Sequence, residues 1–171
     1  GTGDLLYLLA GEKQARVQGI ELDESAVYEC VRKGLSVFQS DIESGLSEYP
    51  ARMFDYVILN QSMQEVKKVD FLISEALRVG TKAIIGFPNF AHLGSRTMLF
   101  LKGKSPVTKS LPYTWYDTPN LRFLSIEDFI EFCAEKSVKV IEAHYLKNGK
   151  EIRFWPNLRA RNAIFVLAKG E

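Results

Sequence analysis

Two glycines at the start of the chain and an acidic residue further on have the types and spacing of a nucleotide-binding site. Gly1 and Gly3 belong to a Gly-Thr-Gly-Asp turn that leads into an apolar helical run, and Glu21 ends the short strand that follows. Glycines let a backbone approach a ligand closely, and an acid about 20 residues further on can accept hydrogen bonds from ribose hydroxyls. Residues 1–23 therefore have the pattern of a nucleotide-binding unit of strands and a helix.

Polar residues also lie at the ends of the later strands that the sequence predicts. Asp41, Asn60 and Asn89 each come at the end of an apolar run that is typical of a strand. In an open parallel sheet, ligands bind at the carboxyl ends of the strands. These residues are therefore expected at the same edge of the sheet as Glu21.

Each of these features also has a simpler explanation. A Gly-x-Gly pair can be a flexible chain start, Glu21 can be a solvated acid, and Asp41 can belong to ordinary turn chemistry. His92 follows a strand and could face the site, whereas His144 lies in a strand pattern typical of a structural or surface residue. No set of residues forms a convincing catalytic constellation, so the catalytic residues stay unknown.

Hydrophobic periodicity predicts the elements that would position these residues. Asp23 and Ser125 have the types of helix N-caps, and Asn148-Gly149 is a typical start for an antiparallel return. The alternation predicts an α/β fold with a mostly parallel sheet and an antiparallel terminal strand pair. Helices are expected at 4–14, 24–33, 69–79, 93–101 and 126–136, and strands at 17–20, 35–39, 54–59, 83–87, 138–146 and 163–168, with a loop at 45–52.

The chain opens inside its glycine turn, and such a turn normally follows a buried parallel strand. We therefore expect the first strand to be missing, a gap beside strand 54–59, and a single N-terminally truncated domain over residues 1–171. Strand 54–59 is apolar nearly throughout, as expected for a strand covered on both faces. Helix 69–79 is expected to bury its apolar residues Phe71, Leu72, Ala76, Leu77 and Val79.

Composition narrows the class of protein. The 171 residues are 46% hydrophobic and 25% charged with a net charge of +1, which fits a globular protein and favours neither general nucleic-acid nor membrane binding. No apolar run approaches the roughly 18 residues of a membrane span. Cys30 and Cys133 have neither CxxC nor metal-ligand spacing, so we expect no metal, buried free thiols and a cytoplasmic location.

A proline-punctuated segment follows the first half of the chain. Residues 102–124 hold three prolines and are expected to be mostly irregular, and long structured loops in compact domains are usually functional. Tyr113, Trp115 and Tyr116 form an aromatic run within it. These rings could pack in the core, or they could form a lid or a partner-docking surface, where Tyr and Trp are enriched.

Several of these stretches match a known family. Gly-Thr-Gly-Asp at 1–4, Gly-Ile-Glu-Leu-Asp at 19–23, Gln-Ser-Asp-Ile at 39–42 and Phe-Asp-Tyr-Val-Ile-Leu-Asn at 54–60 resemble class I S-adenosylmethionine-dependent methyltransferases. More narrowly, the chain is similar to the MetW family of methionine biosynthesis proteins. The stretches at 54–62, 77–80, 87–90, 106–109 and 111–120 carry that narrower resemblance, and 106–120 is the most specific.

The resemblance implies a Rossmann-like three-layer sandwich with strand order 3-2-1-4-5-7-6 and strand 7 antiparallel. It implies that Gly1 and Gly3 face the methionyl part of S-adenosylmethionine and that Glu21 holds the ribose hydroxyls. Further roles follow for four residues. Leu22 would lie beside the adenine, Asp41 would bond its amino group, Ile42 would pack on the ring, and Asn60 would lie at the floor of the site.

Three functions remain open at this point. The resemblance implies a protein that acts with, or activates, a MetX-type homoserine O-acetyltransferase. A methyltransferase acting on a small molecule is the first alternative, since proximity to an activated methyl group needs little help from the protein. An NAD-binding oxidoreductase is the second, which the glycine-acid spacing alone allows.

Overall fold

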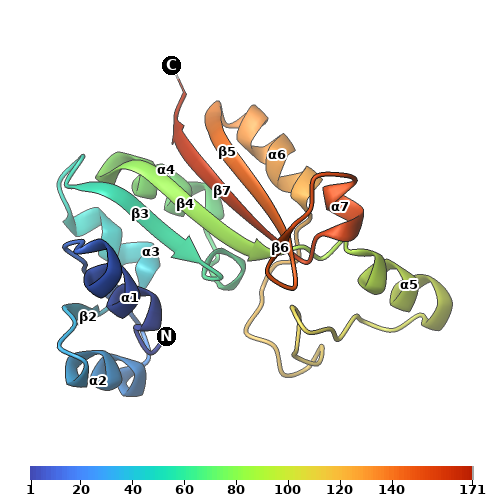
Figure 1. The fold of residues 1–171 in the computed structure, drawn as a ribbon, viewed down its shortest axis with the longest axis horizontal. Coiled ribbons are helices and arrows are strands. Elements are labelled where there is room, and N and C mark those ends of the chain that lie inside the picture. The colour runs from blue at the N-terminus through green and yellow to red at the C-terminus, as the bar shows by residue number, and fades with distance from the viewer. Residues whose placement is uncertain (171) are drawn as a thin grey trace. The chain divides into compact units, whose positions relative to one another are not determined.

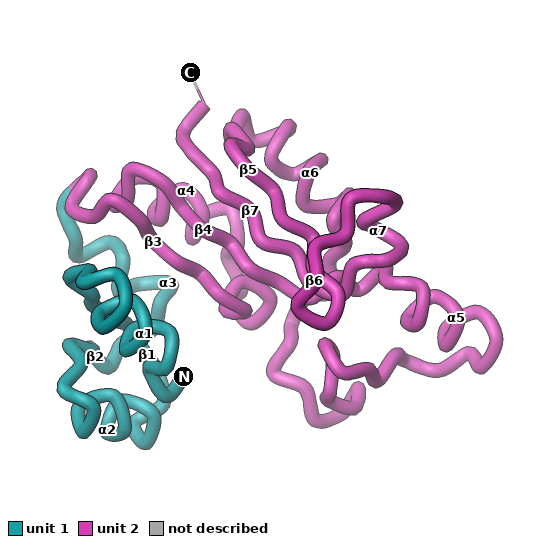
Figure 2. Tube along the Cα trace, in the orientation of Figure 1, with its two compact units in different colours: residues 1–50 teal, residues 51–171 magenta. Residues whose placement is uncertain are grey.

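The computed structural model describes residues 1–170 and divides the chain into two compact units (Figure 1, Figure 2). Unit 1 is Gly1–Pro50 and unit 2 is Ala51–Glu171. Each unit contains a β-sheet of its own. Every helix within residues 1–170 is too short or too polar to cross a bilayer.

Unit 1 combines two short strands with helices. β1 and β2 are parallel, with Glu21 opposite Gln39. Because the strands run in the same direction, Glu21 and Asp41 come at the same edge of this sheet. The elements are α1 (Asp4–Lys13), β1 (Gly19–Glu21), α2 (Glu24–Arg32), β2 (Val37–Gln39), α3 (Ile42–Gly45) and the 3-10 turn η1 (Leu46–Glu48).

The unit 1 strands differ in position from the predicted ones. β1 and β2 each begin two residues later than the apolar runs at 17–20 and 35–39. Leu35 is buried although it lies outside β2, so apolar character here marks packing rather than strand pairing. The loop predicted at 45–52 is confirmed only for 49–52. Gly45 is a buried helical residue that packs against Ile20, and residues 46–48 form η1.

Unit 2 contains a mixed five-stranded sheet in the order β3-β4-β7-β5-β6. α4 packs against β4 and α6 against β5. The segment 103–124 is irregular, as the sequence predicts. The elements are β3 (Phe54–Asn60), the 3-10 turn η2 (Met63–Glu65), α4 (Val69–Val79), β4 (Gly80–Pro88), α5 (Leu93–Lys102), α6 (Ile126–Glu135), β5 (Val138–Lys147), β6 (Lys150–Glu151), α7 (Pro156–Arg159) and β7 (Asn162–Lys169).

The pairing of the unit 2 strands confirms the predicted antiparallel end of the sheet. β3 and β4 are parallel, whereas β7 lies antiparallel between β4 and β5. Asn148 and Gly149 both have positive φ angles, 52° and 76°, and connect β5 to β6. This is the backbone that a two-residue hairpin of right-handed twist requires, and it explains the Asn-Gly pair.

The core of unit 2 lies where β4, β7 and α6 meet. Phe87, Phe129 and Phe165 form a cluster with ring centroids 4.8–5.8 Å apart, and all three side chains are buried. Two expectations about burial are wrong. Phe71 is 43% exposed and Tyr56 of β3 is 51% exposed. Apolar residue type alone therefore overstated burial on α4 and β3.

Both predicted N-caps are confirmed. The Asp23 carboxylate accepts a hydrogen bond from Ala26 N at 2.8 Å and opens α2. Ser125 and Asp128 form a reciprocal capping box, in which Ser125 Oγ accepts from Asp128 N at 3.1 Å and Asp128 Oδ2 accepts from Ser125 N at 2.7 Å. The buried start of α6 is thereby satisfied.

The Ser125→Ala substitution tests the contribution of this cap. It removes the acceptor for the Asp128 amide, so we expect unit 2 to lose roughly 0.5–2 kcal/mol of unfolding free energy. Urea unfolding followed by tryptophan fluorescence measures this loss, because Trp115 and Trp155 both lie in unit 2. Ser74→Ala, at an exposed site on α4, is the control and should leave the midpoint unchanged or raise it. Equal midpoints for Ser125→Ala and wild type would contradict the role of the cap.

Candidate cofactor-binding site

The Glu21 carboxylate is held in a defined orientation at the end of β1. Its Oε1 accepts hydrogen bonds from the backbone N–H groups of Leu22 at 2.8 Å and Asp23 at 3.0 Å. Its Oε2 contacts the backbone nitrogen of Gly1. The glycine turn and the acid, separated by about 20 residues as in nucleotide-binding units, therefore lie side by side in unit 1.

Gly3 allows the glycine turn to lie close to Glu21. Its φ of 77° lies in the left-handed region, and its carbonyl accepts the first helical hydrogen bond, from Tyr7 N at 2.8 Å. A Cβ at this position would lie 2.7 Å from Leu35 Cδ1 and 2.8 Å from Cys30 Sγ. Both the backbone conformation and the space available therefore require glycine.

Lys33, which no sequence pattern indicated as a site residue, holds the other side of the glycine turn. Lys33 Nζ donates to the Thr2 carbonyl at 2.7 Å and to Asp4 Oδ1 at 2.6 Å. The hydrogen bond from Lys33, together with one from Thr2, lowers the pKa of Asp4. Lys33 lies at the C-cap of α2. Thr2 and Asp4 come 31 and 29 positions earlier in the chain, so no local sequence motif connects them with Lys33.

The remaining unit 1 candidates follow the ends of β1 and β2. The Ser40 amide donates to the Glu21 carbonyl at 3.0 Å, so Asp41 comes directly after the paired strand ends. The Asp41 carboxylate accepts from Glu43 N at 2.9 Å and begins α3, where Ile42 is half-buried. Leu22 is 66% exposed and offers an apolar surface next to the acid.

Asn60 ends β3 in unit 2. Its Oδ1 lies only 2.7 Å from the place that a Cβ of Gly86 would occupy. Gln61 has a φ of 58° and donates its amide to the Gly86 carbonyl at 2.7 Å. The glycine on the neighbouring strand thus leaves room for the Asn60 amide at the carboxyl end of the sheet.

Asn89 has a different role from the one its position predicts. It is fully buried, and its Nδ2 donates to the carbonyls of Asn157 at 2.8 Å and Ala160 at 3.0 Å. Its Oδ1 accepts from Ala91 N at 3.1 Å. Because all its polar atoms are used within unit 2, Asn89 is a structural residue rather than a ligand contact.

The two histidines also differ. His92 caps α5 through Nδ1, which accepts from Gly94 N at 3.0 Å, and burial lowers its pKa, with Lys147 and Arg161 adding to the effect. Its Nε2 is buried without a hydrogen-bond partner among residues 1–170. His144 is exposed and pairs with Glu151 at 3.2 Å, which identifies it as a surface residue.

Gly1, Gly3, Glu21, Leu22, Asp41 and Ile42 therefore share unit 1, and Asn60 belongs to unit 2. Residues 1–170 contain no group of three His, Cys, Asp or Glu side chains that could hold a metal. A pocket of about 360 Å³ lies between α4 and α6, lined in part by Met63, Asp70 and Lys136. It contains none of the predicted site residues.

Comparison with known proteins identifies relatives of the chain. The family model for "Methionine biosynthesis protein MetW" matches residues 1–167. A protein from Rhodopirellula baltica, named "Bifunctional methionine biosynthesis protein MetXA/MetW", is 34% identical over 156 residues. These residues are 88% of this chain and 25% of that protein, so the chain spans about a quarter of its relative.

Solved structures share the fold at low sequence identity. A methyltransferase dependent on S-adenosylmethionine from Archaeoglobus fulgidus superposes with a TM-score of 0.73 at 14% identity, covering 99% of this chain and 82% of that one. Magnesium protoporphyrin IX methyltransferase from Synechocystis, solved with bound S-adenosylhomocysteine, gives 0.67 at 15% identity, covering 99% and 71%. The chain thus has the α/β fold of these enzymes.

Gly3→Ala tests the steric constraint at the turn. The added Cβ meets Leu35 and Cys30 and strains the backbone, so unit 1 should lose roughly 1–3 kcal/mol of stability. Gly11→Ala is the matched control, because a Cβ there has nothing within 4 Å and alanine favours the helix. Hydrogen exchange of the unit 1 amides measures both changes. Equal protection in the two variants would show that the turn tolerates a side chain.

Proposed function

The chain belongs to the MetW family of methionine biosynthesis proteins, and on that premise we propose that it binds S-adenosylmethionine and acts in the cytoplasm with a homoserine O-acetyltransferase of the MetX type. The observation that carries the cofactor proposal is the contact between the glycine turn and Glu21 in unit 1. The one that carries the partner proposal is the relative whose name joins MetXA and MetW in one bifunctional protein.

The residues of unit 1 fit the cofactor chemically. A carboxylate offers about four acceptor sites. Glu21 uses two of them on the N–H groups of Leu22 and Asp23 and a third on the Gly1 nitrogen, which leaves one for a ribose hydroxyl. Leu22 and Ile42 would flank an adenine ring, and the Asp41 carboxylate would accept a hydrogen bond from its amino group. Gly1 and Gly3 would leave space for the methionyl part. When bound, S-adenosylmethionine supplies an activated methyl group.

The aromatic run favours a partner surface over a packing role. Trp115 is 75% exposed and Tyr116 73%, and the two rings contact each other edge to face at 5.5 Å. Tyr113 is also exposed. Prolines at 106, 112 and 119 restrict the free loop, which lowers the entropy cost of ordering it in a complex. We therefore place the acyltransferase contact on this segment.

Glu21→Ala in the full-length protein tests the cofactor site. Loss of hydrogen bonds to a charged group should weaken S-adenosylmethionine binding by roughly 1.5–3 kcal/mol, about tenfold to a hundredfold. Isothermal titration with S-adenosylmethionine, S-adenosylhomocysteine and NAD measures the affinities. Glu24→Ala, an exposed acid on α2, is the control and should bind as wild type does.

Two results would contradict this assignment. An unchanged dissociation constant for Glu21→Ala would show that this carboxylate does not hold the ribose. Binding of NAD alone by the wild type would favour an oxidoreductase instead of a protein that uses S-adenosylmethionine.

Trp115→Ala tests the partner surface. An exposed ring contributes little to folding, so the substitution should weaken co-purification with homoserine O-acetyltransferase and leave the melting temperature nearly unchanged. Tyr28→Ala removes an exposed ring from unit 1 and should leave the complex intact. A lower melting temperature with the complex retained would mean that the aromatic run serves packing.

A further inference from the structure

Unit 2 has a second exposed aromatic surface, on the loop formed by residues 153–160. The 153–160 loop, which includes the short helix α7, leaves and rejoins the sheet at neighbouring residues of β5. Ile152 N donates to the Tyr145 carbonyl at 2.7 Å, and Arg161 N donates to the Leu146 carbonyl at 2.8 Å. Loops whose ends lie this close and that pack on their own side chains are often functional.

The inner side of the 153–160 loop is fixed by buried hydrogen bonds. Asn89 donates to the carbonyls of Asn157 and Ala160, and Ala160 is fully buried. Asn157 Oδ1 in turn accepts from Ile126 N at 3.2 Å, at the start of α6. The loop is therefore anchored to the end of β4 and to α6, and its conformation is set before any partner binds.

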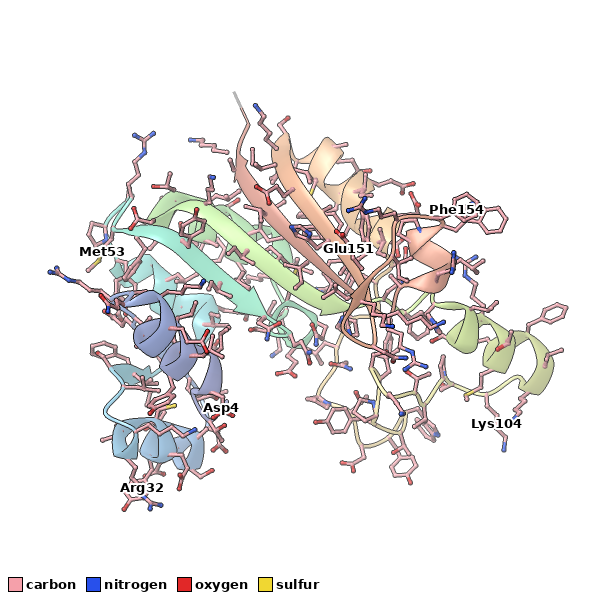
Figure 3. The ribbon with its side chains drawn as sticks, viewed as in Figure 1. Asp4, Arg32, Met53, Lys104, Glu151 and Phe154 are labelled. Atoms are coloured by element: carbon pink, nitrogen blue, oxygen red, sulfur yellow. The ribbon has the colours of Figure 1, made fainter. Side chains whose placement is uncertain are left out.

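Its outer side presents two stacked aromatic rings. Phe154 is 61% and Trp155 63% exposed, and their ring centroids lie 4.9 Å apart at an interplanar angle of 17°. Figure 3 shows the Phe154 side chain pointing away from the sheet. Trp155 has φ 49° and ψ 56°, a left-handed conformation that is unfavourable for a bulky residue. Exposed rings gain little from folding, so the fold does not account for a tryptophan in this strained position.

The surroundings of the aromatic pair are basic. Residues 147–161 include five basic residues and one acidic residue, in a chain whose net charge is only +1. The single acid, Glu151, is paired with His144 and Arg153. Arg159 is exposed and has no ion pair within residues 1–170. The surface thus combines apolar anchors with unneutralised positive charge.

We propose that the 153–160 loop is a docking site for an acidic segment of a protein partner, with Phe154 and Trp155 as anchors and Arg153 and Arg159 as the charged rim. Aromatic and arginine side chains of this kind dominate the binding energy of protein interfaces. The proposal rests on the proposed function for its partner, the MetX-type acyltransferase. Single-stranded nucleic acid fits less well, because the two rings already cover one face of each other and bases need free faces.

Trp155→Gly tests whether the exposed tryptophan ring serves partner binding rather than folding. Glycine adopts the left-handed conformation without strain, so the variant should melt at the wild-type temperature or higher. Its affinity for homoserine O-acetyltransferase, measured by titration of the full-length proteins, should fall about tenfold or more. Gln14→Gly is the matched control, because Gln14 is also exposed and left-handed, with φ 51°, but lies in unit 1. It should bind the acyltransferase as wild type does.

A charge reversal tests the rim independently. Arg153→Glu combined with Arg159→Glu should slow association and reduce the salt dependence of binding, whereas Arg32→Glu on α2 should change neither. Wild-type affinity should fall as salt is raised.

The outcomes separate this inference from the proposed function. If the wild type does not bind the acyltransferase, both fail. If it binds and Trp155→Gly binds equally well, or if Trp155→Gly unfolds at a much lower temperature, only the docking site is overturned. Tight binding of a single-stranded oligonucleotide that Trp155→Gly abolishes would assign the loop to nucleic acid and overturn the proposal.

Discussion

The close approach of a backbone turn to a carboxylate is the constraint on which the candidate site depends. Gly3 must be glycine because its left-handed backbone packs directly against Cys30 and Leu35. That packing lets Gly1 reach Glu21, whose orientation is set by the amides that follow it. A side chain at position 3 would clash with Leu35 and Cys30 and displace the turn from the end of β1. We infer that the cofactor position proposed in unit 1 would be disturbed as well.

Different contacts stabilise the two units. Unit 1 has two three-residue strands and relies on the packing of the turn and on the contacts of Lys33. Unit 2 relies on β4 and β7, whose inward residues are buried, and on Asn89. We propose cofactor contacts in unit 1 and both partner surfaces in unit 2. Substitutions can therefore be designed that affect cofactor binding and partner binding separately.

Features that depend on residues close together in the sequence could be predicted from the sequence. The periodicity of 69–79, the caps at Asp23 and Ser125, and the Asn148-Gly149 turn all appear in the structure as expected. Contacts between distant residues were not predictable in the same way. Asn89 looked like a ligand contact because it ends a strand, but its partners lie about 70 residues away. The contacts of Lys33 likewise form only when α2 packs against the glycine turn. No neighbouring residue in the sequence indicates the left-handed backbone of Trp155.

The most direct test of cofactor binding in unit 1 is to map amide chemical shifts as S-adenosylmethionine is added to the full-length, isotope-labelled protein. We predict that the largest changes fall on the amides of Gly3, Leu22 and Ile42 in unit 1, while the 153–160 loop stays unchanged. Shifts confined to the pocket between α4 and α6, or no shifts at concentrations where titration detects binding, would contradict it.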